Sequence, residues 1–211
     1  MVVSNKTFVP ALFLVALLFA ATCTFPEKGM FNFSGDVGNC KRSGSVFLIP
    51  STGTYLLTGA GTNMWHQSDE FFMAWREVSG DFSLSAEIGF IGKGVDAHRK
   101  LGLIIRESQD ANARYADVCV HGDGLTSLQY RKEVGDMTDE VKWSEMGADH
   151  IVLERKGNKI IMKTAVGKYP EEITGSIELN LPESCYVGLF VCSHNPDVLE
   201  TAYFTNIQFK N

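Results

Sequence analysis

Alternation of apolar and polar residues is the clearest regular pattern along the chain. From Asp81 to Ile91 every second residue is apolar, which is typical of a strand that buries one face. Between Tyr115 and His121, small aliphatic residues alternate with polar and aromatic ones, so each set is expected on its own face. Leu101–Arg106 is almost entirely apolar and is predicted to be a central strand.

About a dozen such runs follow one another, separated by turn signals such as Gly122-Asp123-Gly124 and Lys156-Gly157-Asn158. The predicted strands are 44–49, 53–57, 70–75, 81–91, 101–106, 115–121, 126–131, 150–155, 159–165, 173–179, 185–192 and 201–209. No helical period is evident beyond a turn near Asp110–Ala113. Two packed antiparallel sheets would bury the apolar faces, so we predict an all-β fold, a two-sheet antiparallel β-sandwich.

The amino end has a different pattern. Residues 8–21 read FVPALFLVALLFAA without a charge, and Lys6 precedes them. This run is the length of a signal-peptide core and shorter than the roughly 20 residues that span a bilayer as a helix. A buried core helix is the alternative, which the terminal position disfavours. We therefore predict a signal peptide at 1–23, an N-terminal extension with the first strands at 24–56, and the sandwich at 57–211, in a secreted or periplasmic protein.

Cys23 stands where a lipoprotein signal places its acylated cysteine. Thr22 is a poor residue just before such a cysteine, so a free exported domain and a lipid-anchored one both stay open. A lipid chain would tether the domain to a membrane surface without inserting it.

Charge and cysteine content narrow the possible partners. The formal net charge is -6 and no long basic stretch occurs, which argues against nucleic acid as a ligand. The cluster His98-Arg99-Lys100 is predicted to be a solvated turn. The remaining cysteines can be free thiols or disulfides in an exported chain, with a Cys119–Cys192 bond as one possibility. These four are Cys40, Cys119, Cys185 and Cys192.

Several segments carry a family resemblance, namely 80–82, 90–94, 99–106, 120–131 and 186–196. They resemble the concanavalin A-like domain found ahead of TolB-type β-propellers in secreted bacterial proteins, and are similar to the group named for regulation of enolase. The resemblance runs from Leu57 to Lys210 and implies a concanavalin A-like jelly roll. The superfamily includes lectins, glucanases and laminin-G-like modules, so its fold does not assign a function. A protein partner with a β-propeller is a further implication.

The polar strand faces predict a ligand groove. Sugar recognition uses aromatic rings that stack on apolar sugar faces and planar polar groups that bond to hydroxyls. Trp65, His66 and Trp75 are expected to supply the aromatic platform. The remaining predicted groove residues are Arg106, Asp117, His121, Tyr130, Arg131 and His194. The alternative is ordinary sheet packing with an Arg–Asp pair and core tryptophans.

Metal sites are a second hypothesis. Cys119 and His121, and likewise Cys192 and His194, stand at i and i+2 on one strand face, and two thiolates with two imidazoles suit zinc. Calcium could bind at Asp123 or in the turn with Asp136 and Asp139. Solvated acidic turns are the alternative, and no resident cofactor is predicted.

A glycosidase would need two carboxylates about 5–9.5 Å apart. Candidate acids are Asp69, Glu70, Glu87, Glu107, Asp117, Asp123 and Glu154. The E-x-D-x-E and E-x-D-x-x-E motifs of the superfamily's retaining glucanases do not occur. We therefore predict an exported, non-catalytic binding module for carbohydrate or another cell-envelope component. The alternatives are a glycan-acting hydrolase and a protein-interaction module serving a TolB-like propeller protein.

Overall fold

Every regular element of the described chain is a β-strand. The structure, a computed structural model, describes Met1 and residues 29–211, so the predicted signal peptide and Cys23 lie outside the described residues. The strands are β1 (Phe33–Val37), β2 (Ser45–Ile49), β3 (Thr54–Gly59), β4 (Phe71–Ser79), β5 (Phe82–Ile91), β6 (Lys100–Arg106), β7 (Tyr115–His121), β8 (Leu125–Arg131), β9 (Asp139–Met146), β10 (His150–Lys156), β11 (Lys159–Ala165), β12 (Glu172–Glu178), β13 (Ser184–Cys192) and β14 (Glu200–Lys210). Within this range no helix is long and apolar enough to cross a membrane.

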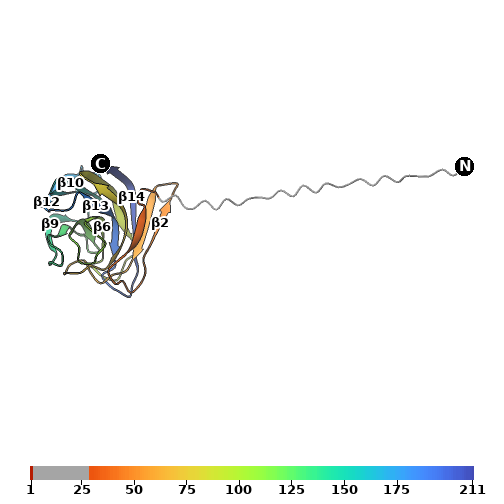
Figure 1. Cartoon of the computed structure of the whole chain (residues 1–211), viewed down its shortest axis with the longest axis horizontal. Coiled ribbons are helices and arrows are strands. Elements are labelled where there is room, and N and C mark those ends of the chain that lie inside the picture. The colour runs from red at the N-terminus through yellow and green to blue at the C-terminus, as the bar shows by residue number, and fades with distance from the viewer. Residues whose placement is uncertain (2–28) are drawn as a thin grey trace.

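The strands form two antiparallel sheets of seven, as the sequence predicts. Sheet A has the order β1-β4-β13-β6-β7-β8-β9, and sheet B has the order β12-β11-β10-β5-β14-β3-β2. Edges of the two sheets meet at both sides of the sandwich, because β12 contacts β9 and β1 contacts β2. Figure 1 shows this arrangement, with β9 and β12 at one side and β2 at the other.

Alternation places the core between the sheets. In β5, Phe82, Leu84 and Ala86 are buried in the main hydrophobic cluster. In β7, Ala116, Val118 and Val120 join the same cluster from sheet A. The two-residue period therefore predicts the inner faces of both strands correctly, because successive side chains of a strand point to opposite faces.

Two strands are missing from the sequence prediction. Strand β1 reads FSGDV and pairs only with β4 at the edge of sheet A. Strand β9 reads DEVKWSEM, and all of its residues are exposed or half-buried. Both are edge strands, so neither needs a continuous apolar face, and the pattern that reveals central strands is weak in them.

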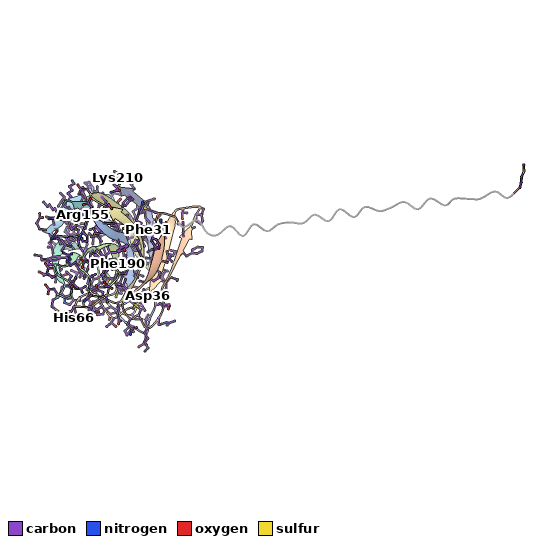
Figure 2. All side chains as sticks on the ribbon, in the orientation of Figure 1. Phe31, Asp36, His66, Arg155, Phe190 and Lys210 are labelled. Atoms are coloured by element: carbon purple, nitrogen blue, oxygen red, sulfur yellow. The ribbon has the colours of Figure 1, made fainter. Side chains whose placement is uncertain are left out.

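The face of sheet A that points away from sheet B, here called the outer face, is also buried in part. A second cluster lies on it, in which Phe71, Ile104, Tyr115 and Phe190 are fully enclosed. The segment 60–70 between β3 and β4 lies over this face, since the Tyr115 hydroxyl donates to the Met64 carbonyl at 2.7 Å. Figure 2 shows His66 of this segment at the end of the sandwich opposite Lys210.

Candidate functional site

An open pocket lies on the outer face of sheet A, where segment 60–70 leaves the strands uncovered. Its volume is about 250 Å³, which is below the roughly 300–1,000 Å³ of sites for drug-sized ligands. Its lining residues are Asn63, Trp65, His98, Lys100, His121, Leu125, Gln129, Glu140, Lys142 and His194.

The register of five neighbouring strands builds the floor. Lys100 begins β6 and stands between Cys192 of β13 and His121 of β7. Gln129 of β8 stands opposite Glu140 of β9. Loop residues complete the wall: Asn63 and Trp65 come from segment 60–70, and His98 and His194 from the loops before β6 and after β13.

Lys100 is the central group of the floor, and only 2% of it is exposed. Its ammonium donates to Asn63 Oδ1 at 3.0 Å and to Gln129 Oε1 at 3.3 Å. It also lies 5.8 Å from the centre of the Trp65 ring, at the outer limit of a cation–π contact. The cluster His98-Arg99-Lys100 is therefore not the solvated turn predicted: Arg99 is also buried and pairs with Glu200 at 2.6 Å.

Gln129 fixes the imidazole of His121. Because Gln129 Oε1 accepts from Lys100, Gln129 Nε2 is a donor, and it lies 3.3 Å from His121 Nε2. His121 Nε2 must then accept, so its proton is assigned to Nδ1, which is buried without a partner among the described residues. Burial, and next the charge of Lys100, lower the pKa of His121 to about 3, so the ring is neutral at physiological pH.

Two further imidazoles stand at the rim. The rings of His121 and His194 lie 5.8 Å and 5.6 Å from that of His98. His194 Nδ1 is 3.3 Å from Asp96 Oδ1. The backbone of His194 is left-handed, with φ of 58°, a conformation that costs a non-glycine residue about 1–2 kcal/mol. Strained backbone of this kind clusters at active sites and ligand-binding sites.

Asp117 lies on the same face of β7 as His121 and stands opposite Gln129. It is fully buried, and neither carboxyl oxygen has a hydrogen-bond partner in the described part of the chain. Burial raises the pKa of Asp117 to about 8, although the nearby Lys100 charge acts in the opposite direction. The carboxyl is therefore mostly protonated at neutral pH, and it is not among the residues that line the pocket.

The structure brings only three of the predicted groove residues together, Trp65, His121 and His194. Arg106 and Arg131 do not line it, because both are fully buried around Asp69. Arg106 donates to Asp69 Oδ2 at 2.8 Å, and Arg131 donates to both carboxylate oxygens, at 2.8 and 2.6 Å. Arg106 also donates to the Asp110 carbonyl, and Arg131 to the Asp136 carbonyl. The two arginines thus hold loops onto the sheet.

Three aromatic predictions also fall outside the pocket. Tyr130 faces the core between the sheets and donates its hydroxyl to Asp139. Trp75 stacks on Phe33 of the edge strand β1, with ring centres 6.1 Å apart. His66 is exposed, and its carbonyl accepts from Arg131.

The cysteines in the described part of the chain are free thiols. All four described cysteines are unlinked, so the hypothesis of a Cys119–Cys192 disulfide is wrong. Strands β7 and β13 flank β6, which separates them by about 9–10 Å, beyond the 7 Å between Cα atoms that a disulfide tolerates. Cys192 contacts the Gly61 and Glu70 carbonyls, and Cys119 contacts the Ser127 hydroxyl.

The candidate metal ligands stay apart as well. Among the described residues, no group of three or more His, Cys, Asp or Glu side chains is placed to hold a metal ion. The four candidate zinc ligands divide between the pocket, lined by His121 and His194, and the buried thiols. At the candidate calcium turns, Asp123 accepts from the Leu125 amide, Asp139 accepts from Tyr130 and the Glu140 amide, and Asp136 is exposed.

None of the candidate catalytic acids lines the pocket. Several are engaged elsewhere: Glu107 with Arg114, Glu154 with Lys156 and Lys163, and Glu70 with Thr62. The pocket's carboxylate is Glu140, which sequence reasoning missed, and it pairs with Lys142 at 3.1 Å. Lys100 was also missed, although it shares a strand face with Arg106.

Sequence comparison finds no matching family model and no matching curated protein. Solved structures match in fold. A functionally unknown protein from Saccharomyces cerevisiae has a TM-score of 0.61 at 11% identity, covering 79% of this chain and 91% of that one. The lectin UEA-II, solved with galactose, has a TM-score of 0.54 at 11% identity, covering 84% and 97%.

A family GH43 protein, BlXynB from Bacillus licheniformis, has a TM-score of 0.53 at 12% identity. The match covers 88% of this chain but 39% of that protein, so this chain spans well under half of its length. The shared architecture is a two-sheet antiparallel β-sandwich of the jelly-roll type, which confirms the predicted fold class.

Proposed function

We propose that this protein is an exported carbohydrate-binding module that holds one sugar unit of a glycan in the pocket on the outer face of sheet A. The observation that carries the proposal is the half-buried ring of Trp65 beside fixed amide and ammonium groups in an open pocket. An aromatic face packs on the apolar side of a sugar ring, and fixed polar groups recognise its hydroxyls.

The charged groups of the pocket favour binding over hydrolysis. A glycosidase needs two carboxyl groups on either side of the bond that it cleaves. Glu140 is the one carboxylate among the lining residues, and it already pairs with Lys142. The lectin that was solved with galactose has the same fold, which shows that such a sandwich can carry a sugar site without assigning one here.

Glycan binding is tested with a glycan array, followed by calorimetry on each glycan that binds. Trp65→Ala is expected to weaken binding by about 2 kcal/mol, or roughly 30-fold, as for a tryptophan at the centre of an interface. Trp75→Ala is the matched control, because Trp75 lies on the same outer face but outside the pocket. Absence of glycan binding, or equal binding by the Trp65→Ala variant, would overturn the proposal.

Export rests on the uncharged run at residues 8–21. Expression in a host with a secretory pathway should yield an exported protein that has lost about the first 23 residues, or one acylated at Cys23. Mass analysis of the exported protein distinguishes the two. An intracellular product with an intact amino end would refute export. An envelope location would also fit the propeller-bearing partner that the family resemblance implies.

A further inference from the structure

The charge of Lys100 is not balanced by the groups around it. The ammonium is buried, and both of its hydrogen-bond partners are neutral amide oxygens, from Asn63 and Gln129. An ammonium has three N–H donors, so one donor has no partner among the described residues. Burying a cation without a counter-charge is costly, and a ligand that supplies the counter-charge would recover part of that cost.

The neighbouring acids do not supply it. Burial raises the pKa of Asp117 to about 8, which leaves this carboxyl mainly neutral at pH 7. Glu140 is paired with Lys142, and Asp96 is engaged by His194 and by the His98 amide. The lining residues therefore carry two ammonium groups and one carboxylate, an excess of one positive charge even with neutral imidazoles. This excess stands out in a protein whose formal net charge is -6.

Hydrogen-bond donors also exceed acceptors around Lys100. Gln129 uses its carbonyl oxygen on Lys100, and its amide nitrogen lies 3.3 Å from His121 Nε2 and 3.5 Å from Glu140 Oε2. His121 Nδ1 has no partner in the described range. His98 and His194 add two imidazoles at the rim. A group that only accepts hydrogen bonds and carries one negative charge complements this set, and a carboxylate is such a group. A phosphate monoester carries nearly twice that charge and matches less well.

We propose that the pocket recognises the carboxylate of a uronic acid residue, bound at Lys100, so that the ligand is an acidic glycan. This inference rests on the proposed function and names the substrate class of the same site. Trp65, whose ring lies next to the Lys100 ammonium, would pack on the sugar ring that carries the carboxylate.

Matched sugars test the inference. Trimers of galacturonic, glucuronic and mannuronic acid are titrated into the protein at low salt, each beside its carboxyl-reduced trimer. At least one acid trimer is expected to bind roughly tenfold or more tightly than its reduced form, as for a hydrogen bond to a charged group. The difference should shrink at high salt, because salt screens the charges. Glucose 6-sulfate and glucose 6-phosphate serve as other anions, and tighter binding of either would overturn the choice of carboxylate.

Asn63→Asp is the most informative variant. The aspartate keeps the oxygen that accepts from Lys100 and from the Met64 amide, but places a negative charge beside the ammonium. It should bring the ratio of acid to reduced affinity close to one, whatever it does to the affinity for the reduced trimer. Lys100→Met should also bring this ratio close to one where it folds, and Lys159→Met, at the exposed start of β11, is its control.

The outcomes separate the two proposals. Loss of all glycan binding on the array contradicts the proposed function itself. Glycan binding that depends on Trp65 but shows no preference for the acid trimers, or a preference that Asn63→Asp leaves intact, refutes the carboxylate inference alone.

Discussion

Asp117 allows a direct measurement of how strongly the outer face of sheet A excludes water. Its carboxyl is fully buried without a hydrogen-bond partner in the described chain. Replacing it with asparagine keeps the shape of the side chain and removes its ability to ionise. The comparison between Asp117→Asn and the parent protein therefore isolates the free energy of ionising this one group.

The magnitude follows from the pKa in the two states. Burial raises the pKa of Asp117 from 3.8 to about 8 in the folded protein. The folded state then binds more protons than the unfolded state between these values, so its stability falls as pH rises through this window. Each pH unit costs about 1.4 kcal/mol. Relative to the parent, the variant should gain about 3 kcal/mol between pH 5 and pH 7, and the gain should level off above pH 8.

Urea unfolding at pH 5, 6, 7 and 9 measures this gain, provided that the m-values agree. Asp136→Asn, at an exposed acid, is the control for general changes in charge. A difference between variant and parent that stays flat from pH 5 to pH 7 would refute the reasoning. Asp117 would then be ionised in the folded state and would balance Lys100, which would also remove the charge excess on which the uronate proposal depends.

Three further predictions concern the surroundings of the pocket. Asp69→Ala should lower the free energy of unfolding by about 3–5 kcal/mol, because it leaves Arg106 and Arg131 buried without their counter-ion; a loss below 1 kcal/mol by urea unfolding would contradict this. His194→Gly should raise the free energy of unfolding by up to about 1 kcal/mol, because glycine adopts a left-handed backbone without strain. The same variant should bind glycan more weakly. A destabilised variant with full affinity would contradict the idea that the strain at His194 serves binding. Burial raises the pKa of Cys192 to about 11 and that of Cys119 well above its usual value. Both thiols should therefore resist alkylation in the folded protein and react after unfolding without reductant. An unfolded protein that stays unalkylated at both cysteines, with a mass two hydrogens below that of the free-thiol form, would instead reveal a disulfide.

The fold could be predicted from the sequence because apolar and polar residues alternate along the central strands. Phe82 to Ala86 in β5 and Ala116 to Val120 in β7 each obey the two-residue period, and that period follows directly from strand geometry. The edge strands β1 and β9 escaped because a strand that buries little needs little apolar sequence. The pairing of β6 with β7 places His121 next to Lys100. This contact depends on how two strands pair, so the pattern within one strand could not predict it.

The site was predicted only in part, for a reason that Arg106 illustrates. Its position on the polar face of β6 is correct, but that face is covered there by loops rather than open to a ligand. Whether a polar strand residue is exposed to solvent depends on the path of loops that are distant in the sequence. Asp69, in the loop that covers Arg106, lies 37 positions from it in the chain. Lys100 escaped for the opposite reason: it appeared to be a solvated turn residue because two basic neighbours precede it, yet it begins a central strand.

The two arginines that do not line the pocket still bear on binding through segment 60–70. This segment carries Asn63 and Trp65 into the pocket, and Asp69 lies near its end. Its path is fixed by the bonds of Asp69 to Arg106 and Arg131, and by the Glu70 amide donating to the Asn63 carbonyl at 2.9 Å. A site held rigidly before its ligand arrives loses less entropy on binding. The buried ion cluster therefore positions the aromatic ring and the amide oxygen that the proposed sugar would meet, so Asp69→Ala should weaken glycan binding even under conditions where the variant remains folded.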